Sequence, residues 1–205
     1  MKWYEADVQQ VEKQIKELEH SPATIFYGSS SIRLWNTLYD DFKPYCPANM
    51  GFGGSTLEAC VYFFPRMMKH MQPKYLVVYA GDNDLGDGKS PEMVLKYFIQ
   101  LNGQIRNQFG DIPYTYLSVK PSITRWHINA TIKHTNLLIK NVISSWKTNT
   151  FFVDIYNPML DQTGFPKKRF YEADGLHLSA DGYQLWKEIL LIHMSSQFNN
   201  LVTGY

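Results

Sequence analysis

The apolar run Tyr75–Ala80 constrains the fold of this chain more than any other segment. It consists only of apolar and aromatic residues, YLVVYA, with no strongly polar position between them. A strand with one solvated face alternates polar and apolar side chains, whereas a strand inside a parallel sheet is covered on both faces and is continuously apolar. The run therefore predicts a buried strand of a parallel sheet, with helices packed on both faces.

The segments around this run alternate between strands and helices, which is the pattern of an α/β protein. Further strands are predicted at 24–27, 45–48, 114–119 and 151–155. Apolar residues at helical spacing predict helices at 4–18, 57–70, 91–109 and 128–146, a short helix at 32–38, and a last helix after residue 179. Pro65 is expected to interrupt or end the helix at 57–70. We therefore expect a three-layer α/β/α sandwich with a five-stranded parallel sheet, formed by a single domain over residues 1–205.

The charge of the chain argues against a nucleic acid or an anionic membrane as its partner. Only 19% of the residues are charged and the net charge is +1, which leaves no large basic surface for phosphate groups. No apolar run reaches the ~20 residues that a membrane-spanning helix needs. We expect a small molecule as the partner, and the sequence gives no indication of the oligomeric state.

The N-terminus and the cysteines predict the cellular location. Residues 1–7, MKWYEAD, are charged and lack the continuous apolar segment of an export signal. Cys46 and Cys60 are the only cysteines, and without an export signal we expect two reduced thiols in a cytoplasmic protein. If an export signal has been removed, the expected location is periplasmic or secreted.

Polar or glycine-rich loops follow three of the predicted strands, and a fourth precedes the last helix. They are Gly28–Ser31, the glycine loop 49–56, Gly81–Asp84 and Asp174–His177. The carboxyl ends of parallel strands lie at the same edge of the sheet, where ligands bind in open α/β folds. Ser30, Gly54, Asn83 and the Asp174/His177 pair are therefore expected to converge although they are far apart in the sequence.

These residue types suit acyl transfer by a serine. A serine hydroxyl needs a neighbouring base to take its proton, and His177 is the candidate. Asp174 would fix the tautomer of the imidazole and stabilise the imidazolium that forms. Negative charge that develops on a carbonyl oxygen requires donors already in place, and the candidates are the backbone N–H groups of Ser30 and Gly54 and the side-chain amide of Asn83.

The four blocks, in this order, resemble the signature blocks of the SGNH (GDSL-like) hydrolases, over residues 24–183. The resemblance implies a flavodoxin-like sandwich and an ester hydrolase that acts through an acyl-serine intermediate, with no cofactor and no metal. It also implies a small acylhydrolase branch, because residues 28–35 read GSSSIRLW. Ser29 stands where the family has aspartate; block alignment makes Ser30 the nucleophile, with Ser31 as the second candidate.

Two other functions compete with this interpretation. A metal-dependent hydrolase would use the acidic residues Asp82, Asp84, Asp87 and Asp174 with His177, but the acidic loop does not match the calcium-loop pattern and no zinc motif is present. A non-catalytic flavodoxin-like module would bind phosphate at residues 29–31, which leaves the His/Asp pair and the asparagine of the other loops unexplained. We interpret Asp84 as structural, bonded to backbone of its own loop.

The substrate is expected to be a small ester. Phe52 in the glycine loop, and Arg125 and Trp126 after the fourth strand, are candidates for the substrate pocket. A short acyl chain is expected, such as an acetyl group on a sugar, or alternatively one arm of a lysophospholipid.

Overall fold

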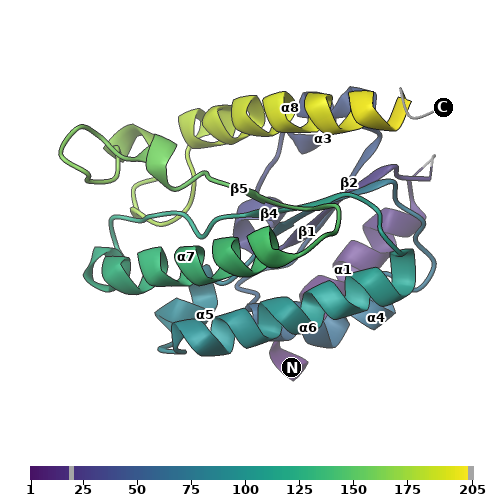
Figure 1. The fold of residues 1–205 in the computed structure, drawn as a ribbon, viewed down its shortest axis with the longest axis horizontal. Helices are drawn as coiled ribbons and strands as arrows, with labels where there is room; N and C mark the ends of the chain where they lie inside the picture. The colour runs from purple at the N-terminus through teal and green to yellow at the C-terminus, as the bar shows by residue number, and fades with distance from the viewer. Residues whose placement is uncertain (19–20, 203–205) are drawn as a thin grey trace.

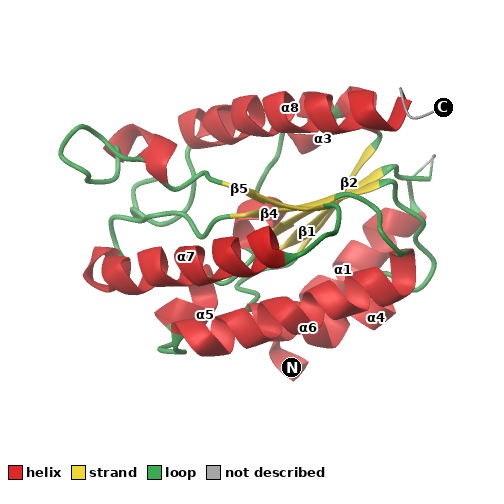
Figure 2. Ribbon diagram, viewed as in Figure 1, coloured by secondary structure: helices red, strands yellow, loops and turns green. Residues whose placement is uncertain are grey.

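A five-stranded sheet forms the centre of the protein, seen in a computed structural model that describes residues 1–18 and 21–202. All of its strand pairs are parallel and the strand order is β2-β1-β3-β4-β5. The strands are β1 (Thr24–Gly28), β2 (Pro47–Gly51), β3 (Tyr75–Tyr79), β4 (Tyr114–Leu117) and β5 (Thr150–Val153). Figures 1 and 2 show helices on both faces of this sheet, so the predicted three-layer fold is confirmed.

The helices divide between the two faces of the sheet (Figure 1). One face carries α1 (Glu5–Lys16), α4 (Leu57–Met67), α6 (Pro91–Phe109) and α7 (Asn129–Ser145). The other face carries α2 (Ser30–Arg33), α3 (Leu38–Asp41) and α8 (Ala180–Val202). A single helical turn, α5 (Asp82–Gly86), follows β3. Among the described residues, no helix combines the length and the apolar character needed to cross a bilayer.

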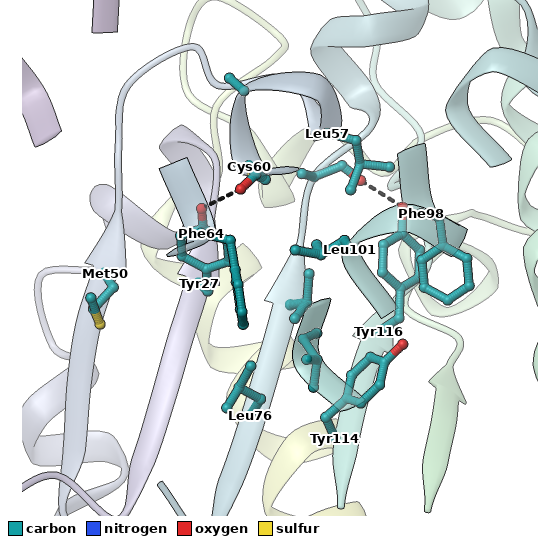
Figure 3. Close-up of a cluster of buried hydrophobic side chains, with 14 of the residues drawn as sticks. Tyr27, Met50, Leu57, Cys60, Phe64, Leu76, Phe98, Leu101, Tyr114 and Tyr116 are labelled. Carbon is teal, nitrogen blue, oxygen red and sulfur yellow. Dashed lines mark hydrogen bonds between the residues drawn. The ribbon is translucent and has the colours of Figure 1, made fainter. Parts of the chain in front are cut away.

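The strands supply side chains to both layers of the core, because successive residues of a strand point to opposite faces. In β1, Ile25 and Tyr27 pack with α1 and α4, whereas Phe26 packs with the helices of the other face. Figure 3 shows two phenols of the first layer whose hydroxyls donate to backbone carbonyls: Tyr27 to Cys60 at 2.7 Å and Tyr116 to Ala80 at 2.6 Å. Every β3 residue is fully buried, as its continuous apolar sequence predicted.

Two elements differ from their predictions. The second strand was expected at 45–48 but spans Pro47–Gly51, because Lys43–Tyr45 form a 3-10 turn and Cys46 has a φ of 45°, which no strand residue adopts. Pro65 lies inside α4 without ending it. A proline there cannot donate to the carbonyl of Val61, and that carbonyl instead accepts from the Gln104 side chain at 3.1 Å.

The region after β1 also differs from its prediction. Instead of one short helix at 32–38, two single-turn helices form, α2 and α3. The turn α5 was not predicted either, because residues 81–84 were expected to be a loop. The turns α2 and α5 directly follow β1 and β3, so both lie at the carboxyl edge of the sheet.

The strand order creates a switch point between β1 and β3, because the chain continues to β2 on one side and to β4 and β5 on the other. Ligands of open α/β folds bind in the crevice outside such a point. Gly28 closes β1 there with a φ of +142°, and a Cβ on it would lie 1.8 Å from the carbonyl oxygen of Tyr79. That carbonyl accepts from the N–H of Ser29 at 2.9 Å. Glycine at 28 thus allows the serine segment to leave the sheet directly beside β3.

Candidate active site

The three consecutive serines differ in their access to solvent. Ser29 is extended and precedes α2, which begins at Ser30. Ser29 and Ser31 are 2% and 4% exposed, whereas Ser30 is partly exposed. Ser30 is therefore the hydroxyl of this segment that a substrate can most readily reach.

Asp174 and His177 form a tight pair on the loop that precedes α8. The Oδ2 atom of Asp174 lies 2.6 Å from Nδ1 of His177, and its Oδ1 accepts from the backbone N–H groups of Leu176 at 2.8 Å and His177 at 2.9 Å. Partial burial acts to raise the pKa of Asp174, but these hydrogen bonds lower it to about 2. Because the carboxylate is ionised at neutral pH, Nδ1 is the donor and Nε2 is left to accept a proton.

A cavity borders the loop of His177 and Leu34, the residue directly after α2. It has a volume of about 550 Å³, and the residues that line it include His177, Leu178, Tyr183 and Leu34. The N–H of Leu34 donates to the carbonyl of Ser30 at 2.8 Å. Within the part of the chain that the structure describes, no hydrogen bond joins Ser30 directly to His177.

Asn83 lies against the glycine loop that contains Gly54. The Asn83 amide donates from Nδ2 to the carbonyl of Ser55, the residue after Gly54, at 3.1 Å. Gly54 is exposed with a φ of +64°, and a Cβ on it would meet nothing within 4 Å. Glycine at 54 is therefore explained here by the left-handed backbone, since a Cβ would have open space around it.

Asp82 forms a buried cluster with two cations behind Asn83. Its Oδ2 lies 2.8 Å from Nζ of Lys120, and its Oδ1 lies 2.6 Å from Nη1 of Arg125. Burial acts to raise the pKa of Asp82, but the two neighbouring cations hold it below its ordinary value. Lys120 was not predicted to belong to this region, although a lysine directly after an apolar strand is a signal of a buried ion pair.

The expected pocket residues separate into three different environments. Phe52 is fully buried among the rings of Tyr4, Tyr27 and Phe63, so it is a core residue and the structure corrects its placement at a pocket. Arg125 binds Asp82 and also donates to Asn83 at 3.0 Å. Trp126 is half-buried against the ring of Phe165, with the ring centroids 4.9 Å apart.

Three of the carboxylates that a metal site would have used, Asp82, Asp84 and Asp174, are engaged by other groups. Asp84 is fully buried; its Oδ2 accepts from the N–H of Leu57 at 2.6 Å, and its Oδ1 lies 3.5 Å from Lys89. The partner of the Asp84 carboxylate therefore lies at the start of α4. We had expected a backbone partner in the loop of Asp84 itself, so that prediction was wrong. Residues 1–18 and 21–202 contain no group of three or more His, Cys, Asp or Glu side chains placed to hold a metal ion.

Solved structures of bacterial proteins share this fold. A protein from Streptococcus pneumonia, provisionally described as a platelet activating factor, gives a TM-score of 0.80 at 18% identity, covering 94% of this chain and 94% of that one. A provisionally described acylhydrolase from Bacteroides fragilis gives 0.79 at 20% identity, covering 94% and 97%. A GDSL-like lipase from Bacteroides thetaiotaomicron gives 0.73 at 18% identity, covering 95% and 98%. At such identities these matches show the fold alone.

The comparison with protein families goes further than the fold. No curated protein matches the chain. The model of the GDSL-like lipase/acylhydrolase family matches residues 24–185. That range begins with β1, ends inside α8 and contains all four motif blocks. The resemblance predicted from those blocks is confirmed, and the chain belongs to the GDSL-like lipase/acylhydrolase family.

Proposed function

We propose that this protein is a serine carboxylic ester hydrolase in which Ser30 is the nucleophile, His177 the general base and Asp174 the residue that orients the histidine. Membership of the family supports ester hydrolysis in general. The assignment of these three residues, the acyl-serine intermediate and the short acyl group are parts of the proposal.

The observation that carries the proposal is the geometry of the Asp174/His177 pair. The 2.6 Å contact at Nδ1 fixes the ring and the tautomer, while two backbone donors fix the carboxylate. A histidine held in this way presents Nε2 as a base, which is the role that a serine nucleophile requires. The cavity of about 550 Å³ beside His177 supplies a place for a substrate.

The proposed reaction proceeds in two halves. The Oγ atom of Ser30 attacks the ester carbonyl while Nε2 of His177 takes its proton, and the imidazolium then protonates the departing alcohol. This leaves an acyl-serine and a neutral histidine. In the second half His177 takes a proton from water, the resulting hydroxide attacks the acyl-serine, and the proton returns to Oγ of Ser30 as the carboxylic acid leaves.

The oxyanion of each tetrahedral intermediate would be bound by the N–H groups of Ser30 and Gly54 and by the amide of Asn83. One of the two N–H groups of the Asn83 amide donates to the carbonyl of Ser55, so the second N–H group is available for the oxyanion. One such donor typically contributes a factor of about 100 to 1,000 to kcat.

The cavity favours a small ester over a long-chain lipid. Leu34, Leu178 and Ala180 give it apolar walls, and Asn36 and Glu172 are among its polar residues. Its volume lies within the range of roughly 300–1,000 Å³ that is typical of small-molecule sites. We therefore propose a short acyl group, such as an acetyl group on a sugar, as the moiety that is removed.

A fluorophosphonate probe tests the nucleophile. We expect covalent labelling of Ser30, identified by peptide mass spectrometry, that chelators do not prevent. Ser30→Ala should abolish labelling, and Ser31→Ala is the matched control that should retain it. Labelling at Ser31 instead, or hydrolysis that requires an added metal, would refute the assignment.

Nitrophenyl esters of increasing chain length test the substrate class. The cavity size predicts the highest kcat/KM for acetyl and other short esters, decreasing as the chain grows. A preference for long acyl chains would contradict the proposed substrate and favour the lysophospholipid alternative.

A further inference from the structure

Arg125 belongs to the loop between β4 and α7, and this loop lies at the end of the sheet where α5 also lies (Figure 1). Its guanidinium makes two contacts with consecutive residues of α5. Nη1 forms the 2.6 Å ion pair with Asp82, and Nη2 donates to Oδ1 of Asn83 at 3.0 Å. Asp82 is held in turn by Lys120 at 2.8 Å. The guanidinium thus connects a buried ion pair to the amide of Asn83.

These contacts define which way the Asn83 amide faces. A guanidinium can only donate hydrogen bonds, so the Asn83 atom that faces it must be the oxygen. The other end of the amide faces the carbonyl of Ser55, which can only accept, so that atom must be the nitrogen. Both contacts therefore require the same orientation, with Nδ2 at the Gly54 loop.

The surroundings of Arg125 leave it little freedom. Its side chain is only 17% exposed, and a Cβ on Gly86 would lie 2.8 Å from the guanidinium, so glycine at 86 makes room for it. The Arg125 N–H donates to Oγ of Ser122 at 3.2 Å, which fixes the backbone as well. Because the Arg125 guanidinium has so little freedom to move, its contact with Asn83 also restricts the Asn83 side chain.

We propose that Arg125 is a positioning residue that orients and polarises the Asn83 amide, so that its free N–H is preset for the oxyanion. The proposal rests on the proposed function for its catalytic consequence. A charged donor on the amide oxygen draws electron density from the nitrogen and strengthens its N–H as a donor, since hydrogen bonds in a chain polarise one another. Arg125 itself does not touch the substrate.

The same loop also contacts the acid–base pair. The hydroxyl of Thr124 donates to the carbonyl of Asp174, and the N–H of Ile123 donates to the carbonyl of Gly175 at 3.0 Å. The proposed oxyanion amide and the histidine loop are therefore attached to neighbouring residues of one segment, and Arg125 is the member that reaches Asn83.

The proposal is tested by measuring kcat and KM of Arg125→Met and Arg125→Lys. The substrate is the ester that the wild type hydrolyses best. An oxyanion donor acts in the transition state, so kcat should decrease by about 10- to 100-fold while KM stays nearly unchanged. Lysine retains the charge but cannot make both contacts, so Arg125→Lys should recover only part of the loss. In an Asn83→Ala background, Arg125→Met should cause no further decrease.

Arg106 provides a matched control. Its side chain is 15% exposed and it makes an equally rich set of contacts, donating to Gly110, Ile112 and Thr150 at the opposite edge of the sheet. Arg106→Met should therefore lower the melting temperature about as much as Arg125→Met, with kcat unchanged.

A second measurement does not depend on catalysis. The side-chain NH2 signals of Asn83, assigned in 15N-labelled protein by their loss in Asn83→Ala, should shift or broaden in Arg125→Met and remain in place in Arg106→Met. Unchanged Asn83 signals in Arg125→Met would overturn the proposal, and so would kcat losses that simply multiply in the double variant. A wild type that neither hydrolyses esters nor labels at Ser30 refutes the proposed function, while the NMR comparison still decides whether Arg125 holds Asn83.

Discussion

Replacing Asp174 by asparagine is expected to remove most of the esterase activity without unfolding the protein. Asparagine has the size and shape of aspartate, so it can keep the two contacts in which Oδ1 accepts from the N–H groups of Leu176 and His177. It then presents an NH2 group, in place of Oδ2, to Nδ1 of His177. Two donors cannot share this contact, so Nδ1 must lose its proton and Nε2 must carry it.

The size of the effect follows from these contacts. Restoring the useful tautomer requires the amide to turn over, which breaks two backbone hydrogen bonds worth about 1 kcal/mol each. The variant also loses the charge-assisted bond to the imidazolium, worth about 1.5–3 kcal/mol. Together these amount to about 3.5–5 kcal/mol, or a decrease in kcat of about 400- to 5,000-fold at 1.36 kcal/mol per tenfold.

Steady-state hydrolysis of nitrophenyl acetate measures the decrease, and thermal unfolding tests the fold. The melting temperature should change little, because the turn keeps its backbone contacts. Asp174→Ala removes those contacts as well and should lower both activity and melting temperature. If Asp174→Asn keeps a kcat within about tenfold of the wild type, Asp174 does not orient His177 and the proposed relay is wrong.

Four further substitutions test the fold. Gly28→Ala should lower the free energy of unfolding by about 3 kcal/mol or more, since its methyl group would lie 1.8 Å from the Tyr79 carbonyl. Gly103→Ala, at an open position inside α6, should raise the free energy of unfolding by about 0.5–1 kcal/mol. Equal effects of the two substitutions in urea unfolding would contradict both predictions. Burial lowers the pKa of His193 below 6.5, so the folded state binds fewer protons than the unfolded state and loses stability as the pH falls below that value. His193→Gln should remove this pH dependence of stability. If the variant keeps the pH profile of the wild-type melting temperature, this prediction is wrong. Asp84→Leu should destabilise the protein by about 1–3 kcal/mol, because the N–H of Leu57 loses its acceptor; a neutral result would mean that water replaces the carboxylate.

Much of the fold could be predicted because its elements carry local signals. The helix at 91–109 begins as expected, with Oγ of Ser90 accepting from the N–H of Met93 at 3.3 Å and Pro91 as the first helical residue. The four residues predicted to form its inner face are all buried: Val94, Phe98, Leu101 and Ile105. The apolar run of β3 was equally clear. In each case the residues that determine the structure are neighbours in the sequence.

The second strand could not be placed correctly because its position depends on distant residues. Pro47 pairs with Thr24 and Gly51 with Gly28, so the register of β2 is set by β1. The local sequence contains two prolines near the strand and no alternation of polar and apolar residues. Contacts between strands, which no local pattern records, decided where this strand begins.

The candidate site also has features that the local sequence predicts and features that depend on contacts between distant residues. The order of the four motif blocks predicted that their loops gather at the carboxyl edge, and two of these loops are in contact where Asn83 donates to Ser55. The partners of the Arg125 guanidinium, Asp82 and Asn83, lie more than forty residues away in the sequence, and no spacing rule relates them. Phe52 was misplaced because a glycine-rich loop suggested exposure, whereas aromatic packing draws its ring into the core.

The buried phenols of the core determine how this protein should respond to alkali. Burial raises the pKa of Tyr27, Tyr79 and Tyr116 well above 10.0, so these rings keep their protons in the native state at a pH where an open chain would release them. The stability that they contribute is complete below pH 10.0 and is lost as the pH rises further. The tyrosinate absorbance of these three residues should therefore be absent over the pH range in which exposed tyrosines titrate. It should then increase steeply at the pH at which the protein unfolds.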